Sequence, residues 1–119
     1  MGGETLPYFQ LGVALLETRD ITGAVPGLEM VVARSPRWEE AHLLLQMAYA
    51  QTDRMPDAIK ECERVLAFDP DHHGTNLLLG RVLEVTGKPA AALPRLKKAA
   101  ALDPKAPEPH MFLAEVYGQ

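Results

Sequence analysis

Residues 79–104 read LGRVLEVTGKPAAALPRLKKAAALDP, two apolar segments separated by a short break. Leu79 and Leu83 are four residues apart, which is the spacing of one helix face. The break VTGKPA contains Thr, Gly and Pro, which are typical helix stop and start signals. The second segment runs to LDP, where the residue before the proline disfavours helical geometry. The stretch therefore predicts a helical hairpin that ends near Pro104.

The same pattern recurs every 34 residues along the chain. Three features share this spacing: a loop proline, an alanine in the second helix and a leucine in the first helix. They are Pro36, Pro70 and Pro104; Ala24, Ala58 and Ala92; and Leu11, Leu45, Leu79 and Leu113. A single hairpin cannot bury its apolar face, so neighbouring hairpins stack and share one core. The small alanine side chains allow the two helices of each hairpin to cross closely.

The breaks between the apolar segments also predict the helix boundaries. The expected helices are about 5–18, 21–34, 39–52, 56–68, 73–86, 89–102 and 107–118. Pro26 and Pro94 occupy the same slot, about one turn into a second helix. A proline inside a helix removes a backbone hydrogen bond. We therefore expect a short kink or a later helix start at both positions.

Over residues 5–119 the sequence closely resembles the tetratricopeptide repeat family. The matching residues are Leu11, Gly12, Leu15, Ala24, Leu28 and Pro36; Leu45, Tyr49, Ala58 and Pro70; and Leu79, Gly80, Leu83, Ala92, Leu96 and Pro104. The resemblance implies an all-α fold, a right-handed superhelical solenoid of antiparallel helix pairs. It implies one domain over residues 1–119 with about three and a half repeats and seven helices, the repeats lying at about 5–38, 39–72, 73–106 and, in part, 107–119.

One slot departs from the family pattern. The bulky aromatic residue that usually opens the first helix appears only as Tyr8, and the matching positions hold His42, Asn76 and His110. We expect the two histidines to pack there rather than to bind a ligand.

In this family the first helices line a concave groove that binds segments of partner proteins. The residues that map to this groove are Phe9, Val13, Leu16, Leu43, Met47, Gln51, Leu77, Arg81 and Val85, with Ala50, Glu84, Met111 and Glu115 alongside. The set is apolar at its N-terminal end, which suits an extended apolar peptide or an amphipathic helix.

One family subtype clamps the carboxylate tail of chaperones with basic and amide side chains. The corresponding slots hold Phe9, Val13, Leu44, Gly74 and Leu78. None of these side chains binds a carboxylate, so the resemblance does not extend to recognition of chaperone tails.

Composition limits the other function classes. The net charge of −4 argues mildly against nucleic-acid binding, which requires a basic face. No run of 18 apolar residues is present, so no membrane span is expected. Cys62 is the only cysteine, which excludes a disulfide framework within the chain and weakly favours a reducing, cytoplasmic location.

The segment Asp69-Pro70-Asp71-His72-His73 could be a metal site or a polar joint between repeats. The equivalent joints in the other repeats contain no histidine, and adjacent side chains on a helix start point about 100° apart. A transition metal needs three or four converging ligands. We therefore expect a joint, with no metal and no cofactor.

No catalytic constellation is apparent. The sequence has no Gly-rich phosphate loop and no CxxC pair. Cys62 falls in an apolar slot of a second helix, where it is expected to be inert core. The predicted function is a non-enzymatic scaffold that binds a protein or peptide partner. The alternative is a structural or self-associating segment of a larger protein that positions an attached domain.

The last helix carries more apolar residues than a polar capping helix does. Leu113 and Tyr117 are expected to pack onto the third repeat. Met111, Phe112 and Val116 would then form an exposed apolar edge, which marks an interface or a cut surface. We therefore expect either a fragment of a longer array or self-association through this edge.

Overall fold

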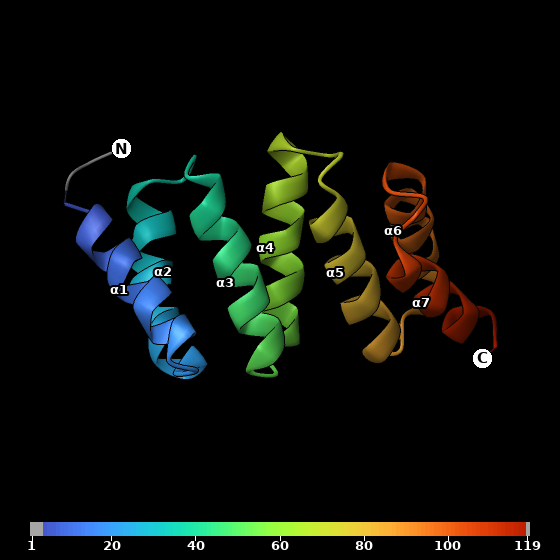
Figure 1. The fold of residues 1–119 in the computed structure, drawn as a ribbon, viewed down its shortest axis with the longest axis horizontal. Coiled ribbons are helices and arrows are strands. Elements are labelled where there is room, and N and C mark those ends of the chain that lie inside the picture. The colour runs from blue at the N-terminus through green and yellow to red at the C-terminus, as the bar shows by residue number, and fades with distance from the viewer. Residues whose placement is uncertain (1–3, 119) are drawn as a thin grey trace. The chain divides into compact units, whose positions relative to one another are not determined.

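The computed structural model describes residues 4–118 and contains only helices in that range (Figure 1). The helices are α1 (Leu6–Glu17), α2 (Ile21–Arg34), α3 (Glu39–Gln51), α4 (Met55–Phe68), α5 (His73–Val85), α6 (Pro89–Leu102) and α7 (Pro107–Tyr117). Each predicted boundary is confirmed to within one residue. The chain divides into two compact units, unit 1 within residues 1–61 and unit 2 within residues 62–119, and the division falls inside α4.

The turn from a first helix to a second helix has the same backbone geometry in three repeats. In the first repeat, Asp20 N–H donates to the Leu15 carbonyl oxygen at 2.8 Å, and Arg19 N–H donates to Leu16 at 3.1 Å. This pair of bonds is a Schellman motif, which satisfies the last carbonyls of a helix. The motif places one residue in the left-handed region, and those residues are Arg19 (φ 69°), Asp53 (φ 62°) and Gly87 (φ 81°).

The joint from a second helix to the next first helix is also repeated. Trp38 N–H donates to Ser35 O at 3.0 Å, and His72 N–H donates to Asp69 O at 3.2 Å. In each joint the proline follows the residue whose carbonyl accepts, which is the preferred place for proline in a turn. The period in the sequence is therefore a period of turn chemistry as well as of helix packing.

Unit 1 is held together by close packing between α1 and α2 and between α2 and α3. Ala24, Leu28 and Val31 of α2 are fully buried. A Cβ built on Gly12 of α1 would lie 3.0 Å from Leu28 Cδ2, so the glycine permits the close approach of the two helices. Ala58, at the matching alanine slot of α4, is also fully buried.

Unit 2 repeats this arrangement with α5, α6 and α7. Its core is formed by Ala92 and Leu96 of α6 together with Val116 of α7. A Cβ built on Gly80 would lie 2.6 Å from Leu96 Cδ2, which is closer than real Cβ contacts allow. The absence of a side chain at Gly80 is therefore what lets α5 and α6 cross at this distance.

The prediction of a later helix start at Pro26 and Pro94 is wrong. α2 begins at Ile21 and α6 begins at Pro89, so both prolines lie inside their helices. Asp20 accepts from Gly23 N–H at 3.0 Å and caps the start of α2. The residues two positions before and after each proline, Ala24 and Leu28 in α2 and Ala92 and Leu96 in α6, are buried in the core, so packing outweighs the one backbone bond that each proline removes.

Candidate functional site

A concave pocket of about 260 Å³ lies on the first-helix face of unit 2, between α5 and α7. It is lined by Gly74, Leu77, Leu78, Arg81, Glu108 and Phe112. The lining comes in register: Gly74 and Leu78 of α5 are 34 residues before Glu108 and Phe112 of α7. The period of the sequence therefore builds the pocket, because equivalent positions of consecutive first helices form its two walls.

The floor of the pocket is continuous with the core of unit 2. Leu77 and Phe112 pack against the buried cluster of Ala92, Leu96 and Val116. Leu78 is half-buried and is not among the residues that pack against this cluster. Leu78 is thus the apolar wall residue whose replacement disturbs the core least.

Arg81 is the basic side chain of the pocket, and its charge is already matched. Its Nη1 donates to Glu84 Oε1 at 2.6 Å and also forms an ion pair with Glu115 of α7. Its guanidinium carbon lies 4.6 Å from the centroid of the Phe112 ring. Two carboxylates and one aromatic face therefore hold this guanidinium flat against the pocket wall.

In unit 1 the predicted groove residues lie on α1 and α3. Phe9, Val13, Leu16 and Leu43 are half-buried, while Met47 and Gln51 are exposed. The Phe9 ring stacks on Trp38, with centroids 4.3 Å apart and planes 25° apart. Leu43 lines a shallow pocket at the start of α3 with Arg37, Trp38, Glu39 and Glu40.

None of the nine predicted groove residues is buried. Two of the nine, Leu77 and Arg81, line the pocket of unit 2. Val85 is exposed at the end of α5 outside this lining. Sequence reasoning missed Glu108 and assigned Gly74 and Leu78 only to the clamp slots. The 34-residue register could have identified them, because Gly74 and Leu78 are equivalent to Glu108 and Phe112. As partner-binding residues, all of them remain predictions.

The C-terminal edge differs from the expectation. Val116 is buried in the core of unit 2, because α6 covers it, and Phe112 is half-buried beneath Arg81. Tyr117, which was expected to pack onto the third repeat, is 63% exposed, and Met111 is 56% exposed. Leu113 packs against the core cluster. The exposed large apolar side chains of α7 are therefore Met111 and Tyr117.

The two adjacent histidines have separate local partners in unit 2. His72 precedes α5, and its Nδ1 accepts from Thr75 N–H at 3.0 Å, which caps the helix. His73 Nδ1 lies 2.9 Å from the Ala99 carbonyl oxygen of α6. Lys98 of α6 pairs with Asp71 at 3.0 Å. The segment thus acts as a polar joint that ties α5 to α6.

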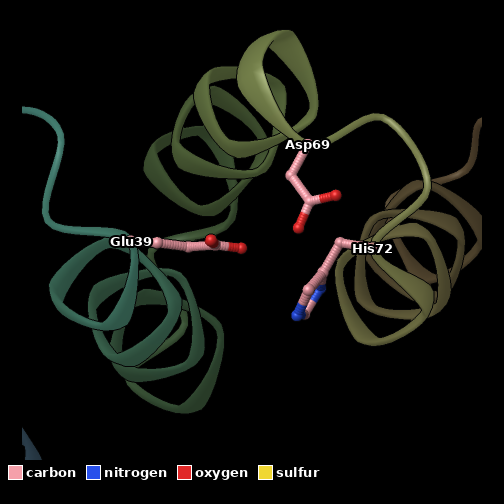
Figure 2. Close-up of side chains that lie close together, drawn as sticks. All are labelled: Glu39, Asp69 and His72. Atoms are coloured by element: carbon pink, nitrogen blue, oxygen red, sulfur yellow. The ribbon is translucent and has the colours of Figure 1, made fainter.

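Figure 2 shows Asp69 and His72 on the two sides of this joint; the third labelled side chain, Glu39, belongs to unit 1. Within residues 62–118, no three His, Cys, Asp or Glu side chains converge as metal ligands do. Two candidate ligands are fewer than a transition-metal site requires. That the joint binds no metal remains a prediction.

The slot where the aromatic residue is missing has a repeated polar role that sequence reasoning missed. His42 Nε2 lies 2.7 Å from the Pro36 carbonyl oxygen, and Asn76 Nδ2 donates to the Pro70 carbonyl oxygen at 3.1 Å. His110 Nε2 lies 3.4 Å from the equivalent oxygen of Pro104. His42 is buried, as predicted, whereas the same prediction for His110 is wrong, since His110 is exposed; Asn76 is also buried.

Tyr49 is a buried phenol whose pKa is raised. Burial, followed by its hydrogen bond to Glu29 Oε2 at 2.5 Å, raises the pKa of the phenol well above its ordinary value. The guanidinium carbon of Arg54 lies 4.6 Å from the centroid of the Tyr49 ring, and Arg54 Nη2 lies 3.6 Å from Glu29 Oε2. Tyr49, Glu29 and Arg54 therefore tie α2 to the end of α3.

Comparison with known proteins agrees with this architecture. The sequence profile of the tetratricopeptide repeat matches residues 9–73 and 77–117. The chain belongs to the tetratricopeptide repeat family. The family fold is a protein-interaction repeat that is typically non-enzymatic, so the chain has the fold of a protein-binding scaffold.

Solved structures of the protein MamA have a similar tetratricopeptide-type fold. A crystal structure of MamA is 24% identical, with a TM-score of 0.92 over 99% of this chain and 64% of the MamA chain. MamA from Desulfovibrio magneticus RS-1 is 23% identical, with a TM-score of 0.88 over 94% of this chain and 63% of that one. MamA MSR-1 is 24% identical, with a TM-score of 0.85 and coverages of 94% and 64%.

This likeness concerns the fold alone. The chain spans 63–64% of the length of these three MamA chains. No curated protein matches the sequence. Among the described helices, none combines the length and the hydropathy needed to cross a membrane.

Proposed function

We propose that the chain is a non-enzymatic scaffold that binds an apolar peptide or an amphipathic helix of a partner protein on its first-helix faces. The observation that supports this most is the pocket between α5 and α7, whose walls are Leu77, Leu78 and Phe112. Its volume of about 260 Å³ is smaller than the ~300–1,000 Å³ typical of small-molecule sites. It suits a few apolar side chains of a peptide that continues across the surface.

Unit 1 offers a second apolar surface of the same kind. Val13 and Leu16 of α1 share one helix face, as do Leu43 and Met47 of α3. All four are half-buried or exposed. We propose that this surface, with Phe9 and Gln51, contacts a partner too. On this view residues 1–119 act as a single repeat domain, with repeats at about 5–38, 39–72, 73–106 and 107–119. A cytoplasmic location suits the single, buried Cys62.

The test is selection of peptides from a displayed library of random sequences, followed by measurement of binding to purified wild-type protein and two variants. Leu78→Gln removes an apolar pocket wall, and Leu102→Gln removes an apolar side chain at the end of α6, outside the pocket. We expect Leu78→Gln to weaken binding about tenfold or more, equivalent to ~1.4 kcal/mol. We expect Leu102→Gln to bind as the wild type does. Circular dichroism must show equal helicity in all three proteins. Equal binding by both variants contradicts the proposed site.

The alternative, a self-associating segment, is favoured by one observation, the exposed Met111 and Tyr117 on α7. Sedimentation of the full chain over a concentration series tests it. A mass that rises with concentration in the wild type, and not in a Met111→Glu, Tyr117→Glu variant, supports self-association. A constant monomer mass contradicts it.

A further inference from the structure

Acidic and basic side chains are divided unevenly between the first and second helices of the repeats. The first helices α1, α3, α5 and α7 carry six carboxylates and one basic residue, Arg81; the carboxylates are Glu17, Glu39, Glu40, Glu84, Glu108 and Glu115. The second helices carry six basic residues and four carboxylates: Arg34, Lys60, Arg64, Arg95, Lys97 and Lys98, with Glu29, Asp57, Glu61 and Glu63. The helices that present the proposed binding faces are therefore strongly acidic.

The pocket of unit 2 shows the same imbalance at close range. Glu108 lines it, and Glu84 and Glu115 both contact Arg81, the one basic residue of its walls. Two of the three basic residues of α6 have other partners, since Arg95 donates to Asn76 and Lys98 pairs with Asp71. Glu108 and Glu115 are both exposed, so two carboxylates against one guanidinium leave the rim of this apolar pocket negatively charged.

Arg81 does not offer a site for an incoming carboxylate. Its guanidinium donates to Glu84, is paired with Glu115 and lies against the Phe112 ring. A peptide carboxylate would have to displace one of these groups and would meet the other acidic side chains at short range. A lysine or arginine of a peptide meets attraction at the same positions, since complementary charge at a rim speeds association and selects partners.

We infer that the segment bound in the unit 2 pocket is basic as well as apolar: a helix or peptide whose apolar side chains contact Leu77, Leu78 and Phe112 and whose lysine or arginine side chains face Glu108 and Glu115. This inference rests on the proposed function, and it specifies the partner's chemistry. It sets the chain apart from repeats that clamp an acidic carboxylate tail.

The experiment uses two designed helical peptides of about 18 residues, five turns long. Both carry leucine at positions i, i+4, i+7 and i+11, so each has one apolar face. The first has lysine and the second has glutamate at the same flanking positions. Fluorescence anisotropy measures the binding of each peptide to the full chain at low and at high salt.

Three variants accompany the wild type. Leu78→Gln removes an apolar wall. Glu108→Gln with Glu115→Gln removes two rim charges. Glu63→Gln, on the exposed surface of α4, is the control that removes a charge away from the pocket.

We expect the lysine peptide to bind at least about tenfold more tightly than the glutamate peptide, and this preference should shrink at high salt. The double glutamine variant should lose most of the preference, while Glu63→Gln should keep it. Leu78→Gln should weaken the lysine peptide without reversing the preference.

The outcomes separate the two proposals. If neither peptide binds the wild type, the proposed function fails and the inference with it. If both bind equally, or if the glutamate peptide binds more tightly, the pocket remains a binding site but the inference about charge is wrong. If Glu63→Gln loses the preference as fully as the double variant does, the net charge of the whole protein explains the preference, and its assignment to the pocket rim is overturned.

Discussion

The second and third repeats hold different polar residues, His42 and Asn76, at the position where the family usually has an aromatic residue. The second-helix residues that pair with them have opposite charges. In the second repeat, His42 lies 2.7 Å from both the Pro36 carbonyl oxygen and Glu61 Oε2. In the third repeat, Asn76 donates to the Pro70 carbonyl oxygen and accepts from Arg95 at 3.3 Å. Glu61 and Arg95 are also 34 residues apart, so they occupy equivalent positions. The second repeat pairs a histidine with an acid, and the third pairs an amide with a base.

The shared requirement is a donor for the carbonyl oxygen of the joint. That oxygen only accepts, so His42 must carry its hydrogen on Nε2, and a shared proton must lie between Nδ1 and Glu61. Asn76 meets the same requirement with its amide nitrogen and turns its oxygen to the arginine. The two pairs differ in burial: the side chains of His42 and Glu61 are 5% and 1% exposed, whereas Arg95 is half-buried. The slot therefore selects a hydrogen-bond donor, and the residue on the second helix must match the polar atom that remains.

The largest effect is expected from truncating one member of the buried pair. Glu61→Ala or His42→Ala should lower the free energy of unfolding by ~3–5 kcal/mol, because each leaves a buried ionisable partner behind. Asn76→Ala should cost less, ~1–3 kcal/mol, because Arg95 can reach water. Urea denaturation followed by circular dichroism measures the three losses.

The exchange of pairs sharpens this prediction. Glu61→Arg alone faces a histidine, whereas His42→Asn with Glu61→Arg installs the pair of the third repeat. The double variant should be more stable than the single one. The interpretation of matched pairs is contradicted if the double variant is the less stable of the two, or if Asn76→Ala costs more than Glu61→Ala.

An intermediate difference is expected at the two glycines of the helix crossings. Gly80→Ala should destabilise by ~1–3 kcal/mol through overpacking, because its Cβ would lie 2.6 Å from Leu96 Cδ2 and 3.3 Å from the Leu96 backbone nitrogen. In Gly12→Ala the added Cβ contacts only the Leu28 side chain, at 3.0 Å. Replacing a helical glycine by alanine also stabilises the folded state by ~0.5–1 kcal/mol. Its net effect should be close to zero. Melting temperatures of the two variants check this ranking, and equal losses would show that α1 and α5 cross their partners alike.

The smallest effects are expected at the turns after the first helices. Gly87→Ala should destabilise by ~1 kcal/mol because an alanine at φ 81° is strained, although nothing lies within 4 Å of the added Cβ. Arg19→Gly should stabilise by ~0.5 kcal/mol, because it relieves the same strain at φ 69°. Asp53→Gly should gain less, since aspartate tolerates this region better than arginine. Chemical denaturation of the three variants gives the order, and a destabilised Arg19→Gly would contradict the shared turn geometry.

Local signals explain why the helices could be predicted closely. The first helices α1, α3 and α5 end at Schellman turns that lie 34 positions apart, and each second helix ends before a joint proline. These signals act within a few residues along the chain. The prediction of a later helix start at Pro26 and Pro94 was wrong because it considered only the local effect of proline. Other residues of both helices are buried in a core, which stabilises the helix around the proline.

The site was predicted less completely because it depends on what covers each side chain. Leu11, Leu45 and Leu79 share one slot, yet Leu11 is 55% exposed and the other two are buried. Tyr49 and Tyr117 share another, yet Tyr49 is buried and Tyr117 is exposed. Equivalent sequence positions have different surroundings wherever the neighbouring helix differs.

By itself, the sequence determined the family, the seven helices, the turns and joints between them, and the slots that face a hairpin partner, because helix propensity, turn chemistry and a 34-residue period act locally. Only the tertiary structure decided that Gly74, Leu78, Glu108 and Phe112 form one pocket, that Val116 is buried, that two carboxylates hold Arg81, and that His42 and Asn76 bind the joint carbonyls. Those features depend on the distance between helices, which close packing sets and a single sequence does not state.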